Sequence, residues 1–481
     1  MTSDDTPNLL VIMSDEHQAR AMGCAGHPFV KTPNLDALAA RGVRFTDATT
    51  PCPICVPARA SFATGRYVHH TRLWDNAMPY DGSIPGWGHA LQRKGVPVES
   101  IGKLHYRAAE DPAGFDIEHI PMMVADGVGM VWASIRREDE RIHGPKRMLG
   151  EYIGPGESTY TRYDAAVTER TVAWLTSREG DRRPWCLYVG LVAPHFPLVV
   201  PDEFFDLYPP ESLPEPKLSP ATDYRRHSWV EKQNAFMDSE ARFASPEERK
   251  AAMAAYHGLC TWLDHNVGRI LAALEASGQG GRTTVVYTSD HGDNVGARGL
   301  WGKSNLYRES VDIPMLMAGP DIVPGVCGTP VSLVDLSHTI AAHFGTAIDG
   351  EPMARPLPEI AAAPPEPDRI AFSEYHAAGA VSGAFMLRRG RWKYHRYVGF
   401  PSELFDLDSD PEELTDLAAD PAYATVLDRM EAALRTICDP EAVDALAFAD
   451  QAALVERHGG REAALALGAP GATPPPKIAS P

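Results

Sequence analysis

The chain has 481 residues, more than a single ordinary hydrophobic core requires, which predicts one large domain with a smaller companion. Hydrophobic residues make up 44% of the chain and charged residues 23%, as is typical of globular proteins. The formal net charge of −19 argues against nucleic acid or an anionic membrane as a partner.

Cysteine usage and the N-terminal residues predict the cellular compartment. Seven cysteines, an odd number with wide spacing, do not form a disulfide framework. The first residues carry aspartates where a signal peptide needs basic side chains. The most apolar later stretch, residues 185–200, contains two prolines and a histidine and is therefore not a membrane span. We expect a protein of the reducing cytoplasm.

Short apolar runs predict strands that are buried on both faces, as in a parallel sheet covered by helices. Amphipathic stretches lie between them, and the first has Thr32 as a helix cap and Pro33 at the first helical position. In chain order, we predict a strand at 8–13, helix 33–41, strand 96–102, helix 163–177, strand 185–192, helix 246–277 and strand 283–288. This alternation predicts an α/β fold with a large central, mostly parallel sheet between helices.

The composition shifts to alanine and proline at residues 361–368, which predicts a linker. Beyond it, residues 384–397 and 402–410 favour strands of a small antiparallel sheet, and a helix follows near 422–438. We therefore predict a large α/β domain over residues 1–365, a small α+β subdomain over 366–445 and a tail over 446–481. The Pro- and Gly-rich end of this tail is a candidate oligomerisation arm.

Carboxylates follow two of the predicted strands at the point where each strand ends. Asp15 and Asp290 hold these positions, and each precedes a second potential ligand, Glu16 or His291. Ligands of open α/β sheets bind beyond the carboxyl ends of the strands, and clusters rich in oxygen suit Ca²⁺, Mg²⁺ or Mn²⁺. An aspartate at a strand end also commonly closes a turn or caps a helix, so this pattern alone leaves both interpretations open.

A cysteine-rich stretch, residues 49–67, contains Cys52 and Cys55 in a C-x-x-C arrangement. A redox pair, a zinc site and a phosphatase nucleophile are the alternatives to consider. The chain offers no second C-x-x-C for zinc, and Arg59 follows Cys55 by too few residues for a phosphatase loop.

Residues 55–59, Cys-Val-Pro-Ala-Arg, are followed by Thr64 and Gly65, and here the sequence resembles the sulfatase family of the alkaline phosphatase superfamily. Further segments are similar to that family in the same order, at residues 102–105, 193–197, 289–314 and 402–418. The resemblance implies an alkaline-phosphatase-like fold. It also implies that a formylglycine-generating enzyme oxidises Cys55 to formylglycine (3-oxoalanine) during maturation, and that Cys52 is incidental.

The resemblance further implies a role for each matching residue. A hydroxyl of hydrated formylglycine attacks sulfur, Arg59 orients it, and His105 takes the proton of the second hydroxyl so that sulfate is released. His195 is the general acid, and Lys103 and Lys303 bind the sulfate oxygens. The metal ligands are Asp15, Glu16, Cys55, Asp290 and His291. Glu16 stands where many relatives have Asp, and His291 leaves Ca²⁺ and Mn²⁺ both open, with Ca²⁺ preferred.

The expected substrate is a small sulfate ester, with arylsulfatase activity and a phosphoesterase side reaction. The nearest alternative is a phosphonate or phosphate ester hydrolase, whose members tend to carry Tyr and Thr where this chain has Lys103 and His105. Residues 74–95 look similar to choline sulfatases, which makes Asn76 a candidate substrate contact together with His195, Lys103 and Lys303. A quaternary ammonium pocket would need an aromatic cage, for which Trp74, Tyr80 and Tyr106 are available, although scattered core aromatics are the simpler interpretation.

A different class is a non-catalytic protein, or one that uses Cys52 and Cys55 as a redox pair. We also expect a homo-oligomer.

Overall fold

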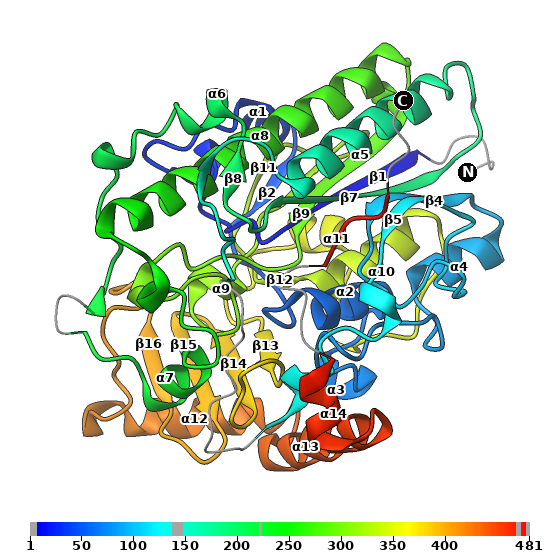
Figure 1. Ribbon diagram of the computed structural model, residues 1–481. Coiled ribbons are helices and arrows are strands. Elements are labelled where there is room, and N and C mark those ends of the chain that lie inside the picture. The colour runs from blue at the N-terminus through cyan, green and yellow to red at the C-terminus, as the bar shows by residue number, and fades with distance from the viewer. Residues whose placement is uncertain (1–6, 137–147, 221–223, 468–472, 478–481) are drawn as a thin grey trace.

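The computed structural model describes residues 7–136, 148–220, 224–467 and 473–477. Its centre is an eight-stranded sheet with the order β11-β2-β10-β9-β1-β7-β4-β5 (Figure 1). In that order the strands are Gly325–Cys327, Val43–Phe45, Met315–Ala318, Thr283–Ser289, Asn8–Asp15, Cys186–Pro194, Val98–Lys103 and Ile117–Met122. Only β10 runs antiparallel to its neighbours in this sheet, which confirms the predicted mostly parallel sheet.

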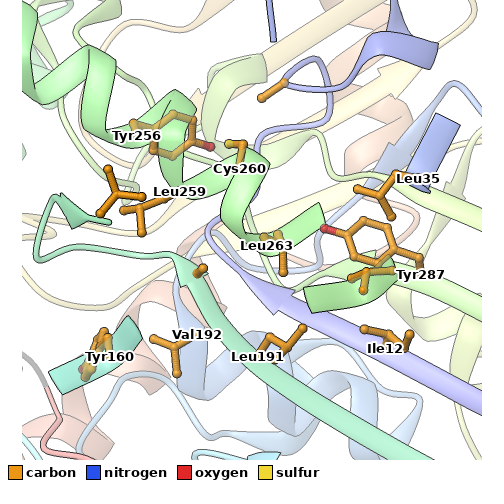
Figure 2. Packing of buried hydrophobic residues seen from close by; sticks show 14 of the residues in the cluster. Ile12, Leu35, Tyr160, Leu191, Val192, Tyr256, Leu259, Cys260, Leu263 and Tyr287 are labelled. Atoms are coloured by element: carbon orange, nitrogen blue, oxygen red, sulfur yellow. The ribbon is translucent and has the colours of Figure 1, made fainter. Parts of the chain in front are cut away.

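Helices cover both faces of the sheet because alternate residues of the buried strands point to opposite faces. In β1, Leu10 and Ile12 join the core under α1 (Pro33–Ala40), α5 (Thr159–Thr176) and α8 (Pro246–Ala276). Leu9, Val11 and Met13 join the other core, with α2 (Cys55–Thr64), α4 (Trp87–Lys94) and α10 (Leu333–His343). Figure 2 shows the first core at Ile12, with Leu263 of α8 and Leu35 of α1 nearby.

Thr32 is the N-cap residue of α1, as predicted, but its side chain does not cap the helix. Pro33 does occupy the first turn of α1, but the side chain of Thr32 makes no capping hydrogen bond. The Thr32 hydroxyl instead accepts a hydrogen bond from the Gly23 backbone N–H and donates one to Asp36. A tertiary contact with the preceding loop therefore replaces the local cap.

The C-terminal subdomain is built on a four-stranded antiparallel sheet of β13 (Ala371–Tyr375), β14 (Ala384–Arg389), β15 (Trp392–Tyr397) and β16 (Glu403–Asp406). Three helices follow, α12 (Ala424–Leu434), α13 (Pro440–Arg457) and α14 (Gly460–Ala466). Buried residues of this sheet share one hydrophobic cluster with Cys52, Tyr67 and Trp229 of the large domain.

The predicted boundary between residues 445 and 446 lies inside α13, and residues assigned to the tail up to Ala466 are largely helical. α13 begins because the side chain of Asp439 accepts hydrogen bonds from the Glu441 and Ala442 N–H groups, with Pro440 at the first helical position. The predicted linker also differs, since its first two residues complete α11 (Leu357–Ala362).

The remaining elements are short. They are α3 (Val68–Thr71), α6 (Asp202–Phe205), α7 (Ser228–Asn234), α9 (Arg308–Val311), β3 (Ala48–Thr49), β6 (Gly154–Pro155), β8 (Val199–Val200) and β12 (Val331–Ser332). Among the described residues, no helix combines the length and the apolar character that crossing a membrane requires.

Candidate active site

The two strand-end aspartates predicted from the sequence meet at the carboxyl edge of the main sheet. Asp15 ends β1 and Asp290 follows β9, and these strands pair in parallel with Ser14 opposite Ser289. Helix α2 begins at Cys55 and brings its Sγ to 3.2 Å from His291 Nε2 and 3.6 Å from Asp15 Oδ1. One ligand atom from each of these four buried residues lies within 4.8 Å of all the others.

Backbone contacts orient this cluster toward a common point. His291 Nδ1 donates to the Gly292 carbonyl at 3.0 Å, so that Nε2 keeps its lone pair for the cluster. Asp290 Oδ1 accepts from the His291 and Glu16 N–H groups. Two carboxylates, one imidazole nitrogen and the atom at position 55 make a donor set that fits a divalent cation.

Arg59 lies one helical turn after Cys55 and is fully buried. Its Nε donates to Asp290 at 2.8 Å and an Nη atom donates to Asp15 at 3.1 Å. The other Nη atom donates to the Lys103 carbonyl and to the Tyr188 hydroxyl, each at 3.0 Å. The guanidinium therefore locks the two metal-ligand candidates to α2, and Arg59 does not itself line the cavity, although it donates to the carbonyl of Lys103, which does.

Lys103 ends β4 and places its Nζ 2.5 Å from Asp15 Oδ2. Burial alone would raise the pKa of Asp15, but Lys103, His195 and Arg59 hold it well below its usual range. Asp15 is thus ionised and ready to bind a cation.

Glu16 lies apart from the four-residue cluster, in a second group with Asp15 and His195. Its Oε2 accepts from Lys303 Nζ at 2.8 Å, and its carboxyl group also interacts with the side chain of Asp293. Burial raises the pKa of Glu16 well above its usual range, against the pull of Lys303. The longer side chain therefore reaches the lysine that is expected to bind sulfate.

His195 follows β7 with Nε2 at 3.4 Å from Glu16 Oε2. Its Nδ1 lies 2.5 Å from the Phe196 carbonyl, which can only accept, so Nδ1 carries a proton. Burial and the nearby Lys303 lower the pKa of His195 well below its usual range. The neutral imidazole thus presents a lone pair at Nε2.

Thr473 belongs to this site although no sequence pattern indicated it. Its hydroxyl lies 2.8 Å from His105 Nε2, and its carbonyl accepts from the Tyr160 hydroxyl at 2.7 Å. His105 has a positive φ of 60°, and burial together with Lys103 lowers its pKa well below the usual range. Thr473, from the C-terminal part of the chain, therefore contacts His105, which follows β4.

These groups open into a cavity of about 110 Å³. Six of the predicted site residues line it: Cys55, Asn76, Lys103, His105, His195 and Lys303. Asn76 accepts a hydrogen bond from the Val56 N–H at 3.2 Å and so holds the first turn of α2. Residues that the sequence did not indicate also line it, from α7 and the turn after it: Gln233, Asn234, Phe236 and Met237.

The candidate aromatic cage does not line this cavity. Trp74 is buried and donates its Nε1–H to Asp450, while Tyr80 and Tyr106 pack edge to face at 5.0 Å in the core. Cys52 is also buried among hydrophobic residues, and all seven cysteines are unpaired. Burial and Asp15 raise the pKa of the unmodified Cys55 thiol to about 12, which opposes thiolate chemistry.

Comparison with known proteins identifies the family. The model of the family described as "Sulfatase" matches residues 7–346, and one described as "N-sulphoglucosamine sulphohydrolase, C-terminal" matches residues 296–439. A choline-sulfatase of Rhizobium meliloti strain 1021 is 34% identical, covering 84% of this chain and 81% of its own. Arylsulfatase K of Danio rerio is 27% identical, covering 85% and 80%.

Among solved structures, a phosphonate monoester hydrolase from Silicibacter pomeroyi superposes with a TM-score of 0.72 at 25% identity, covering 89% of this chain and 94% of its own. The first family model alone spans most of the large domain, including every residue of the buried cluster at the sheet edge. This chain belongs to the sulfatase family and is a sulfuric ester hydrolase.

Proposed function

We propose that this enzyme hydrolyses small sulfate esters through a formylglycine at position 55 and one divalent cation, with arylsulfatase-type activity. The observation that carries the proposal is the convergence of Cys55, Asp15, Asp290 and His291 on one buried point beside a cavity lined by two lysines. When present, formylglycine supplies a hydroxyl nucleophile and the cation polarises the sulfate oxygens.

The cation would be held by Asp15, Asp290, His291 and the residue-55 oxygen, and Glu16, the fifth ligand candidate, shares a second group with Asp15 and His195. Ca²⁺ suits the carboxylates, and the imidazole nitrogen keeps Mn²⁺ and Mg²⁺ as alternatives. Formation of the aldehyde needs a formylglycine-generating enzyme as a maturation partner.

The chain's own side chains would neutralise the charge of the transition state. Lys103 and Lys303 line the cavity and supply two ammonium groups for the sulfate oxygens. Arg59 keeps Asp15 and Asp290 in place from behind. These contacts favour the transition state, in which the leaving oxygen and the sulfate oxygens carry more negative charge than in the monoanionic ester.

Two histidines would move protons. His195 holds its Nδ1 proton on a carbonyl, so Nε2 is the atom that would face the leaving oxygen. The negative charge of the bound sulfate would raise the low pKa of His195, so that Nε2 takes up a proton from water and delivers it to the leaving oxygen. His105 lies at the same cavity, and its low pKa keeps it neutral and able to remove the proton that permits sulfate release.

The alternative activity is hydrolysis of phosphonate or phosphate esters, which the name of one structural relative suggests. Lys103 and His105 favour sulfate in this chain, because both lie in the cavity where phosphonate-cleaving relatives are expected to carry Tyr and Thr. We expect phosphoester cleavage as a side reaction, since both reactions place similar negative charge against the same groups of the active-site cavity. A higher kcat/KM for a phenyl phosphonate than for a phenyl sulfate would reverse this order.

The decisive experiment is mass spectrometry of the tryptic peptide 45–59, from protein made together with a formylglycine-generating enzyme. Fragment ions separate Cys52 from Cys55. We expect an aldehyde or its hydrate at 55, an intact thiol at 52, and release of sulfate from p-nitrophenyl sulfate. Active protein with two thiols, or with a 52–55 disulfide, would refute the mechanism.

A further inference from the structure

Apart from its four basic side chains and Cys55, the described lining of the active-site cavity is uncharged. Its apolar part comes from several separate segments and includes Met130, Phe236 and Trp301. Its other polar groups include the side-chain amides of Asn76, Gln233 and Asn234, which are neutral. No carboxylate lines the cavity among the residues that the structure describes.

The aromatic walls are fixed by contacts behind them. The ring of Phe236 stacks on Trp132 with centroids 4.9 Å apart and planes at 15°. Trp301 donates its Nε1–H to Glu240 at 2.7 Å and packs against Phe243. The apolar surface is therefore preformed and does not depend on a ligand to assemble it.

The charged groups at the described surface of the cavity are two ammonium groups. Lys103 and Lys303 line it, paired from behind with Asp15 and Glu16, and Lys303 Nζ lies 4.8 Å from the ring centre of Phe196. One face of the Phe196 ring is therefore already in contact with an ammonium group of the protein. A second cation in the cavity would meet two lysines and gain no carboxylate from the described lining.

The size of the cavity also limits the leaving group. Its volume is about 110 Å³, and cavities of about 150 Å³ lined by apolar side chains hold a benzene molecule. This volume is smaller than the one that holds a single benzene molecule, so it favours a small leaving group beside the sulfate. Thr473 forms part of the cavity wall.

We propose that this sulfatase selects small sulfate monoesters whose leaving group is uncharged and apolar, and that it disfavours a quaternary ammonium there. The inference rests on the function proposed above and narrows its substrate class. It separates this chain from the relative named choline-sulfatase, despite their 34% identity.

The test compares two substrates that differ in one atom. Choline sulfate and 3,3-dimethylbutyl sulfate have nearly the same shape and the same kind of alkyl leaving oxygen, but only the first carries a positive nitrogen. With formylglycine-containing enzyme we expect kcat/KM to be at least about tenfold higher for the neutral ester, a difference of about 1.4 kcal/mol. Equal or better turnover of choline sulfate would overturn the inference.

A gain-of-charge variant tests the cause. Met237 lines the cavity and is partly exposed, and Met237→Glu would add a carboxylate there, whereas Met237→Gln has nearly the same shape without charge. We expect the glutamate variant to shift the ratio toward choline sulfate by about tenfold and the glutamine variant to keep the wild-type ratio. An unchanged ratio in the glutamate variant would contradict the electrostatic explanation.

p-Nitrophenyl sulfate separates this inference from the function on which it rests. Hydrolysis of the aryl ester with a preference for choline sulfate among the alkyl esters overturns the selectivity alone. Failure to cleave any of the three esters, with the aldehyde verified at position 55, overturns the proposed function itself.

Discussion

Arg59→Lys tests whether the buried guanidinium holds Asp15 and Asp290 in place at the carboxyl edge of the main sheet. Arginine makes four hydrogen bonds here, two to the carboxylates of Asp15 and Asp290 and two to neutral oxygens. A lysine ammonium keeps the charge but reaches at most one carboxylate, because it lacks the planar fork. The substitution therefore removes one charge-assisted bond and two bonds to neutral groups.

The magnitude follows from what each lost bond contributes. A bond to a charged partner contributes about 1.5–3 kcal/mol. Bonds to acceptors that stay satisfied contribute about 1 kcal/mol each, and the Lys103 carbonyl still accepts from the Tyr188 hydroxyl at 3.2 Å. We expect Arg59→Lys to lower the free energy of unfolding by about 3–5 kcal/mol.

Arg66→Lys is the matched control from the residue just after the same helix. Arg66 makes two bonds to Asp349, one to its carbonyl and one to its carboxylate, but this side chain is 96% exposed. A surface pair of this kind contributes little, so the expected change is below about 0.5 kcal/mol. Urea unfolding of both variants in the presence of EDTA measures the difference without metal binding. If Arg59→Lys and Arg66→Lys lowered the free energy of unfolding by similar amounts, burial would not be what determines the contribution of the guanidinium.

Three further predictions concern other parts of the molecule. Lys393→Met removes the partner of the buried Glu413, 2.6 Å away, and should lower the free energy of unfolding by about 3–5 kcal/mol. Burial alone would raise the pKa of Glu413, but Lys393 holds it below its usual 4.5. The difference in the free energy of unfolding between the wild type and Lys393→Met should therefore be present at neutral pH and shrink as pH falls below that value. A difference that grows in acid would contradict this expectation. Thr473→Val should lower kcat about two- to tenfold through loss of the contact to His105, with Thr473→Ser retaining it, and an unaffected kcat would remove this positioning role. Chelation should abolish sulfate release, and titration with Ca²⁺ or Mn²⁺ should restore it; full activity after exhaustive chelation would exclude the cation.

Local chemistry made part of the site predictable. Cys55 and Arg59 are close in sequence, and one helical turn carries both to the same buried cluster. Asp15 and Asp290 each follow a continuous apolar run, so adjacent parallel strands were enough to bring them together. In these cases the covalent spacing and the strand pattern already contain the geometry.

The contacts of Glu16 could be established only from the side-chain positions in the structure. Its place beside Asp15 predicted a metal ligand, but its longer side chain contacts Lys303, which lies 287 residues away. The hydroxyl of Thr32, the N-cap residue of α1, makes no capping bond because it accepts from the Gly23 N–H and donates to Asp36. Such side-chain partners depend on how the buried polar groups of neighbouring segments meet.

The sequence by itself determined the α/β sheet, the family motif and the nucleophile candidate, because each depends on residues that are neighbours in the chain or repeat with the strand and helix periods. Only the tertiary structure decided what encloses the substrate. Thr473 contacts His105 across 368 residues, and Phe236 and Met237 reach the cavity from the turn after α7. Such contacts leave no local pattern, since they are selected by the packing of whole elements rather than by the spacing of residues along the chain.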